Sequence, residues 1–172
     1  MLFRSRPGLR FIAPMASAAV RTEFEAALRQ CVDAPPVALI DGMAQQVMTA
    51  ADVVLCAGGT AILEAMLLKR PVVMAYKVTP LTYWLASWLV KIDMFSLPNL
   101  LAGQRLIPEF IQDQVSAANL SSAVLEYLER PDQAAALRET FTRLHQALRR
   151  DADHSAARVV MNVLQSREQQ RR

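Results

Sequence analysis

The chain has 172 residues, enough for one domain with a substantial core. Apolar residues make up 53% of it and charged residues 20%, a composition that argues against disorder. The net charge of +3 is small, and no basic stripe interleaved with aromatic residues occurs, so we expect no nucleic-acid partner. No segment approaches the roughly 20 apolar residues of a membrane-spanning helix, so at most a surface contact with a membrane is expected.

Short apolar runs alternate with segments of helical periodicity in the first half of the chain. The runs predict strands at residues 9–15, 37–40, 53–56 and 72–76, and the periodic segments predict helices at 18–30, 43–51 and 60–68. The strands are continuously apolar, which is typical of parallel strands covered on both faces. The sequence therefore predicts an α/β fold with a Rossmann-like parallel sheet, whose ligand site lies at the carboxyl ends of the strands.

The pattern changes after residue 77. A helix is predicted over residues 79–91, followed by an irregular stretch over residues 95–110. Three further helices are predicted to form a C-terminal extension, at residues 117–129, 131–150 and 154–165. Residues 166–172 are expected to fray.

A glycine turn follows the third predicted strand and carries the strongest functional signal. Gly58, Gly59 and Thr60 open a helix, and we place Glu64 on the first turn of that helix. A helix N-terminus presents unpaired N–H groups and a partial positive charge, which suit a phosphate. Glu64 lies four residues after Thr60 and therefore on the same helix face, where a carboxylate can accept from both hydroxyls of a ribose. The pattern indicates a nucleoside-diphosphate site.

The same residues also have a purely structural interpretation. Gly58 and Gly59 can form a tight turn with Thr60 as a helix cap, and Glu64 can be a solvated charge. A capping box would place its acid three residues after the cap, where the sequence has Leu63, so capping by Thr60 does not explain Glu64. Spacing alone leaves both interpretations open.

Asn99 lies in the stretch predicted to be irregular. Its amide both donates and accepts, so it can contact a sugar or a base edge. The alternative is an Asx-type turn beside Pro98.

Three aromatic residues lie in the predicted helix over residues 79–91: Tyr83, Trp84 and Trp88. One interpretation is an interfacial helix whose tryptophans sit at the level of the lipid headgroups. The alternative is a helix packed in the core of the domain.

The sequence contains no pattern for a metal or a redox group. Cys31 and Cys56 match no zinc or redox spacing, and neither His145 nor His154 has a ligand companion nearby in sequence. We therefore expect no metal and no cofactor.

Two segments resemble those of the lipid-A-disaccharide synthase family, which are bacterial glycosyltransferases with two Rossmann-like halves. The first is AGGTAILEAMLLKRPVVMAYK at residues 57–77, and the second is TPLTYWLASWLVKIDMFSLPNLLAG at residues 79–103. The SLPNLLAG string within the second segment is the most specific part. The resemblance covers residues 9–165, so residues 1–8 are a leader that does not match. Gly58 stands where the family usually has serine.

The resemblance implies that this chain is the UDP-binding, C-terminal half of a GT-B type enzyme. It further implies that the first strand of that half, its helix and the whole acceptor half with its catalytic acid lie outside the chain, which leaves an exposed sheet edge. The chain therefore carries no catalytic residue of its own, and we expect it to be inactive alone. The implied binding residues are Gly58, Gly59, Thr60, Glu64 and Asn99.

The implied reaction transfers a diacylated glucosamine from UDP-2,3-diacylglucosamine to 2,3-diacylglucosamine 1-phosphate, which forms the lipid A disaccharide and releases UDP. The acylated substrates imply a peripheral location on the cytoplasmic face of the inner membrane. Two alternatives remain: another UDP-sugar transferase or epimerase of the same fold, and a non-catalytic module that docks on a membrane or a partner. The sequence also leaves open whether the chain forms a homo-oligomer.

Overall fold

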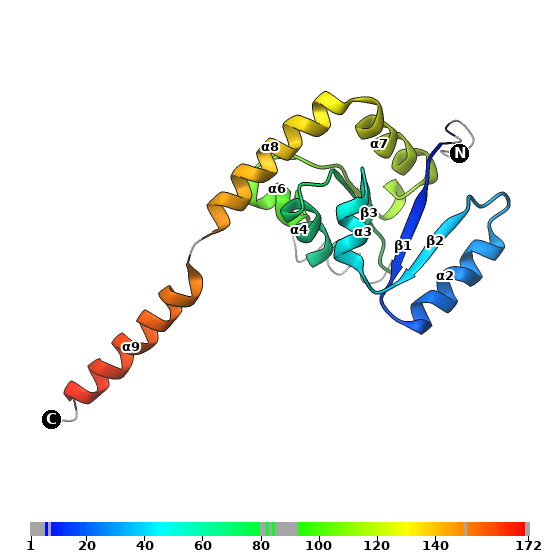
Figure 1. The fold of residues 1–172 in the computed structure, drawn as a ribbon. Helices are drawn as coiled ribbons and strands as arrows, with labels where there is room; N and C mark the ends of the chain where they lie inside the picture. Colours follow the sequence, from blue (N-terminus) through cyan, green and yellow to red (C-terminus); the bar gives the residue numbers. More distant parts are fainter. Residues whose placement is uncertain are drawn as a thin grey trace.

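The computed structural model describes residues 6, 8–79, 82, 84, 93–149 and 151–170 (Figure 1). The first half alternates strands and helices: β1 (Phe11–Met15), α2 (Ala18–Gln30), β2 (Val37–Asp41), α3 (Ala44–Ala50), β3 (Val54–Cys56), α4 (Thr60–Leu67) and β4 (Val72–Tyr76). The second half contains α6 (Leu97–Ala102), β5 (Glu109–Ile111), the 3₁₀ turn η1 (Gln112–Gln114), α7 (Ala117–Glu129), α8 (Pro131–Leu148) and α9 (Ala152–Gln170). Parallel strands that alternate with helices, followed by a long C-terminal helix, confirm the predicted α/β fold.

The strands of the described residues form two sheets rather than one. Strands β1 and β2 pair in parallel, with Phe11 opposite Val37. Strand β4 pairs in parallel with β3 on one side and with β5 on the other, with Met74 opposite Glu109. Helix α3 contacts both β1 and α4, and thereby connects the two sheets through packing.

The core surrounds β4. Val72 and Val73 have no exposed surface, because α4 and α7 contact this strand and β3 and β5 flank it. Helix α8 crosses this unit and inserts Phe141, which is also fully buried. Burial on both faces explains the continuous apolar sequence of β4. The residues of the main cluster are Met48, Ile62, Ala65, Met66, Val72, Met74, Ile107, Leu137 and Phe141.

The prediction of an irregular stretch at residues 95–110 was wrong, because this stretch contains α6 and β5. Ser96 caps α6 by accepting from the Asn99 N–H at 3.4 Å, and Pro98 lies in the first turn, where its missing N–H costs nothing. Gly103 ends the helix with a φ of +65°. The proline and the glycine therefore mark the two ends of a short helix.

Two helical predictions need adjustment at the C-terminus. Helix α8 ends at Leu148, and α9 is helical through residues 166–170, where we expected a frayed end. Helix α9 extends away from the rest of the molecule (Figure 1). Among the residues that the structure describes, no helix is both long and apolar enough to cross a membrane.

Candidate functional site

The glycine turn lies at the carboxyl end of β3 and leads directly into α4. Gly59 is the N-cap residue of α4, and among the described residues no side chain accepts a hydrogen bond from the first turn of the helix. The first N–H groups of an α-helix have no partner within the helix. Gly59 and Thr60 are both exposed, so these donors face the outside of the protein. This end of α4 can therefore bind an anion.

The backbone of the turn favours glycine. Gly58 has a φ of +112°, and Gly59 has a φ of +70° with a ψ of −148°, a combination open almost only to glycine. A Cβ atom on Gly58 would meet Met74 Cε and Tyr76 Cδ2 at ordinary contact distances of 3.5 Å, and one on Gly59 would meet no atom within 4 Å. Backbone conformation, rather than lack of space, therefore explains both glycines.

The prediction that Glu64 lies on the first turn of α4 was wrong. Thr60 is the first helical residue, so Glu64 is the fifth and begins the second turn, and the first turn carries no acidic residue. The side chain of Glu64 is exposed, and no hydrogen bond or ion pair joins it to another described residue. The helical rise puts it about 6 Å from Thr60 along the axis, on the same face. It therefore remains available to a ligand that is bound at the helix N-terminus.

Tyr76 is an additional candidate that the sequence reasoning missed. It is the last residue of β4, its side chain is 43% exposed, and its ring lies beside the backbone of Gly58. An exposed aromatic ring next to the glycine turn offers a surface on which a base or a sugar can stack. The sequence could have indicated Tyr76, because it ends a predicted parallel strand and ligands bind at the carboxyl ends of such strands.

Asn99 does not join this group. Its side chain is fully buried, and its Nδ2 donates to the Ile107 carbonyl at 3.0 Å and to Glu109 Oε1 at 2.8 Å. Its Oδ1 accepts from the N–H groups of Leu106 at 2.7 Å and Ile107 at 2.9 Å. Both donors and both acceptor positions are thus used within the protein. The structure gives Asn99 the role of holding the 103–108 loop between α6 and β5.

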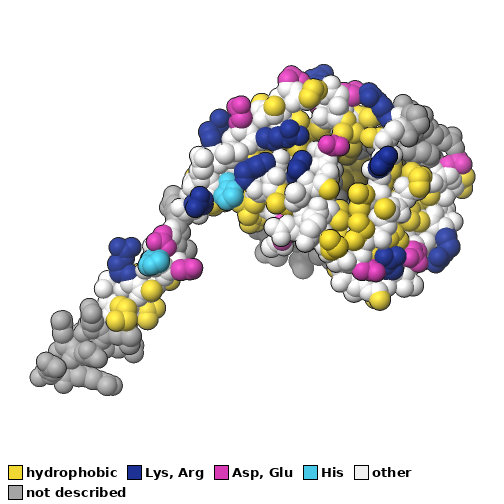
Figure 2. All heavy atoms as spheres, viewed as in Figure 1, with side chains coloured by type: hydrophobic (Ala, Val, Ile, Leu, Met, Phe, Trp, Pro, Cys, Tyr) yellow, Lys and Arg dark blue, Asp and Glu magenta, His cyan; other side chains and the backbone are white. Residues whose placement is uncertain are grey.

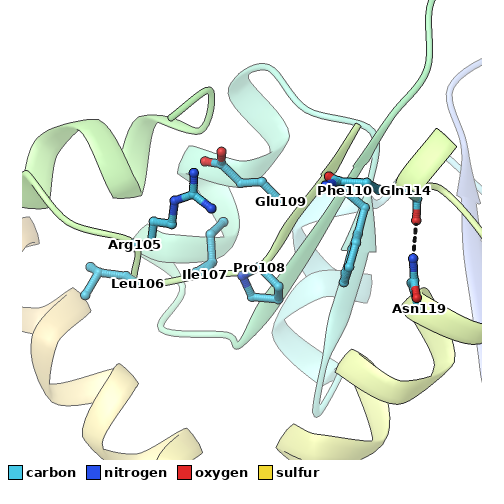
Figure 3. Close-up of a pocket in the computed structure, with 8 residues that line it drawn as sticks. All are labelled: Arg105, Leu106, Ile107, Pro108, Glu109, Phe110, Gln114 and Asn119. Carbon is cyan, nitrogen blue, oxygen red and sulfur yellow. Dashed lines mark hydrogen bonds between the residues drawn. The ribbon is translucent and has the colours of Figure 1, made fainter. Parts of the chain in front are cut away.

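A cavity of about 500 Å³ is lined by residues of that loop and of β5 (Figure 3). Its lining includes Arg105 and Glu109, which come from the two ends of the stretch between residues 105 and 109. The Glu109 carboxylate already accepts from the N–H groups of Phe95 and Ser96 as well as from Asn99. None of the residues predicted to bind a ligand lines this cavity, and its carboxylate is occupied, so the glycine turn remains the better candidate.

The aromatic residues predicted to contact a membrane are only partly described. Trp84 is helical and 63% exposed, whereas Tyr83 and Trp88 lie outside the described residues. In the described part of the chain, no three His, Cys, Asp or Glu side chains gather into a potential metal site.

Burial raises the pKa of the Cys56 thiol, and a backbone hydrogen bond from Gly58 acts in the opposite direction. Cys56 is the last residue of β3, immediately before the turn. A raised pKa keeps this thiol in its neutral form at pH 7, so it adds no negative charge beside the exposed N–H groups.

The fold and the turn define a class: a parallel α/β protein with a glycine-rich turn between the carboxyl end of a strand and a helix. Comparison with known proteins gives the family. The family model for lipid-A-disaccharide synthetase matches residues 2–160, and the chain belongs to this family.

Individual relatives agree with this assignment. The chain is 49% identical to the lipid-A-disaccharide synthase of Alkalilimnicola ehrlichii over 156 residues, which are 91% of this chain and 41% of that protein. It is 43% identical to the synthase of Cellvibrio japonicus over 162 residues, which are 94% of this chain and 42% of the relative. The synthase of Escherichia coli O139:H28 is 40% identical over 165 residues, or 96% of this chain and 43% of the relative. The chain thus spans less than half the length of these relatives.

Proposed function

We propose that this chain is the UDP-sugar-binding part of a glycosyltransferase that makes the lipid A disaccharide. In this proposal the donor is UDP-2,3-diacylglucosamine and the acceptor is 2,3-diacylglucosamine 1-phosphate. The observation that carries it is the exposed N-terminus of α4, which follows two glycines of positive φ and has no side-chain cap. Membership of the lipid-A-disaccharide synthetase family supports the identity of the sugar nucleotide.

The N–H groups at Gly59 and Thr60 bind the diphosphate of the donor, whereas the Gly58 N–H bonds to the Cys56 sulfur and Gly58 contributes the shape of the turn. When the bond between the sugar and the diphosphate breaks, negative charge grows on the departing UDP, and fixed N–H donors stabilise that charge without having to reorganise. The partial positive charge of the α4 N-terminus acts in the same direction.

The Glu64 carboxylate accepts from the ribose hydroxyls. It lies one turn along the exposed face of α4 from the diphosphate site, and no described residue competes for it. The Tyr76 ring, which lies beside Gly58, stacks on the base or the sugar. Asn99 acts indirectly, because it fixes the loop that leads into β5 at the edge of the same sheet.

In this proposal the acceptor-binding half and the catalytic acid belong to polypeptide outside this chain. The relatives are more than twice as long as the region matched here, because that region is 41–43% of their length. We therefore expect the purified chain to bind UDP and to transfer no sugar. Turnover by the purified chain with both acylated substrates would contradict this division of roles.

Isothermal titration of UDP into the chain tests the nucleotide site. The Glu64→Gln variant should weaken UDP binding by about tenfold, because a charge-assisted hydrogen bond contributes roughly 1.5–3 kcal/mol. Glu139→Gln is the matched control, because Glu139 is also an exposed helical glutamate but lies on α8. Equal UDP affinities of the two variants would remove Glu64 from the site.

A contact with the membrane surface through Trp84 is a separate part of the proposal. The 63% exposure of this side chain supports it, because an exposed tryptophan partitions into the headgroup region. Sedimentation with vesicles of anionic phospholipid should recover the chain, and Trp84→Ala should reduce the recovered fraction. Equal recovery of both proteins would contradict a membrane role for Trp84.

A further inference from the structure

A lysine occupies a position at the end of α4 where glycine is usual. Leu68 is the C-cap residue of α4, and Lys69 follows it with a φ of +60°. The Lys69 N–H donates to the Met66 carbonyl at 3.0 Å, and the Arg70 N–H donates to the Ala65 carbonyl at 2.9 Å. This pair of hydrogen bonds ends many helices, most often with glycine in the position of Lys69. A lysine is strained in this conformation, so we expect its side chain to have a specific use.

The Lys69 side chain turns back to its own helix and to α8. Its Nζ donates to the Leu67 carbonyl at 2.5 Å and lies 2.5 Å from His145 Nδ1. His145 is in the last turn of α8, and both side chains are half-buried. Among the described residues, no carboxylate forms an ion pair with Lys69. The side-chain partner of this amine is therefore a basic nitrogen and not an acid.

The two contacts suit a neutral amine. His145 Nδ1 accepts a hydrogen bond only when the ring hydrogen is on Nε2. A neutral Nζ uses its two hydrogens for the Leu67 carbonyl and for His145 Nδ1, so its electron pair points away from both partners. Burial lowers the pKa of the Lys69 ammonium from its ordinary value of 10.5, which increases the neutral fraction. Lys69 thus has the features of a nucleophilic amine in contact with a base.

Cationic side chains accompany this amine on α4 and α8. Arg70 has no hydrogen-bond or ion-pair partner among the described residues, and its Nε is buried. Figure 2 shows Lys and Arg side chains gathered along α8, where the helix and its C-cap carry Arg138, Arg143 and Arg149. The N–H groups of an arginine match the oxygens of a phosphate. This surface therefore favours a reagent that carries a phosphate group.

We propose that Lys69 is a site of acylation by small acyl phosphates, with His145 as the base and Arg70 as the group that holds the phosphate. The Nζ electron pair attacks the acyl carbon and forms the C–N bond. His145 Nδ1 accepts the proton that Nζ directs to it, the bond between the acyl carbon and the phosphate oxygen breaks, and inorganic phosphate leaves. An acylated Nζ keeps one hydrogen and cannot donate to both partners, so the modification should loosen the contact between α4 and α8. The proposal does not depend on the nucleotide site.

Mass spectrometry of the full chain after treatment with acetyl phosphate tests the proposal. Lys77 is the internal control, because it is exposed and has no partner among the described residues. Lys69 should be acetylated about tenfold faster than Lys77 or more, since general base catalysis typically contributes at least this factor. In urea, where the contacts of Lys69 are lost, the two rates should become similar. A Lys69 rate no higher than that of Lys77 in the folded chain would overturn the proposal, as would a preference that persists in urea.

A variant at His145 separates a base from a merely structural contact. His145→Asn keeps an acceptor oxygen but cannot take up the proton, so the free energy of unfolding should change little while the Lys69 rate falls to that of Lys77. His154→Asn is the matched control, because His154 is exposed and bonded to Asp151, and it should leave the Lys69 rate unchanged. An unchanged Lys69 rate in a folded His145→Asn chain would contradict the role of the imidazole. If this variant does not fold, the comparison of Lys69 with Lys77 needs no substitution and still decides.

A neutral acetylating ester tests the class of donor. N-hydroxysuccinimide acetate carries no charge, so Arg70 gives it no advantage. The preference for Lys69 over Lys77 should be several-fold larger with acetyl phosphate than with this ester, and Arg70→Gln should remove the difference. Equal preferences with the two reagents, or a difference that survives Arg70→Gln, would show that acyl phosphates are not selected.

Discussion

Asn99 donates a hydrogen bond from its Nδ2 to Glu109 Oε1 at 2.8 Å, and this bond connects α6 to the first residue of β5. Glu109 in turn accepts from the N–H groups of Phe95 and Ser96, which precede α6. The two side chains therefore bind both ends of the segment that runs from α6 to the edge of the sheet. This arrangement explains why an amide and a carboxylate are needed between α6 and β5.

Replacing Asn99 by alanine should destabilise the protein severely. The change leaves the N–H groups of Leu106 and Ile107 without partners in a buried region, and an unsatisfied buried group costs roughly 1–3 kcal/mol. We expect the free energy of unfolding to fall by about 3 kcal/mol in urea titrations. Gln104→Ala, in the same loop but exposed, should change it by less than about 0.5 kcal/mol. A small effect of Asn99→Ala would show that water replaces the amide.

Gly59→Ala should weaken both folding and UDP binding. A Cβ atom at this position meets no other atom, so the cost comes from the backbone conformation and should be about 1–3 kcal/mol. A shift of the turn out of this conformation would also misalign the N–H groups that we assign to the diphosphate. Thermal unfolding and UDP titration measure the two effects. Gly8→Ala is the control, because Gly8 has no positive φ and open space around it. Identical behaviour of the two variants would contradict a special conformation at Gly59.

Tyr127 should make the protein lose stability at alkaline pH. Burial, with a smaller effect of the Glu126 charge, raises the pKa of Tyr127 to about 12 from an ordinary value of 10.0. The folded state therefore holds the phenol proton more tightly than the unfolded state does. The contribution of Tyr127 to the free energy of unfolding is fully present below pH 10. As the pH rises toward 12, this contribution is lost and the free energy of unfolding falls by about 2 kcal/mol. Urea titrations at several pH values measure this loss. The loss between pH 10 and 12 should be smaller in Tyr127→Phe, and an unchanged loss would assign it to other groups.

Phe141→Ala should test the attachment of α8 to the rest of the fold. The ring is fully buried against a cluster that includes Ile62 and Met66 of α4. Removal of a buried phenylalanine typically costs about 3–5 kcal/mol through lost transfer energy and the resulting cavity. Urea titration should show this loss, and Glu139→Ala, an exposed change on the same helix, should show little. A loss below about 1 kcal/mol would mean that the surrounding side chains collapse into the space.

The sequence predicted the βα alternation well because hydrophobic periodicity reports burial directly. Helix α2 was predicted with the bounds that the structure gives, since its caps and its periodicity agree. Strand β5 was missed because it has only three residues, and its assignment depends on pairing with β4, which no local pattern reveals. The glycine turn was predicted at its observed place, because its conformation is encoded by residues that are adjacent in sequence.

The role of Asn99 shows the limit of reasoning from residue type. An amide in a stretch of leucines can bind a sugar or a backbone, and the choice depends on whether unpaired N–H groups lie next to it in the fold. Those groups belong to Leu106 and Ile107, seven and eight residues later, across a helix end. Tyr76 was missed for a related reason, because its position beside Gly58 comes from the pairing of β3 with β4.

The small share of the core that the β1–β2 sheet and α2 hold has a consequence for cooperativity. All residues of α2 are described and none of them is buried, whereas the unit around β4 holds most of the core. The two parts of the molecule should therefore melt in separate transitions on heating, the N-terminal part first. A calorimetric trace with two peaks would record this, and a ligand that joined the sheets would merge the peaks into one.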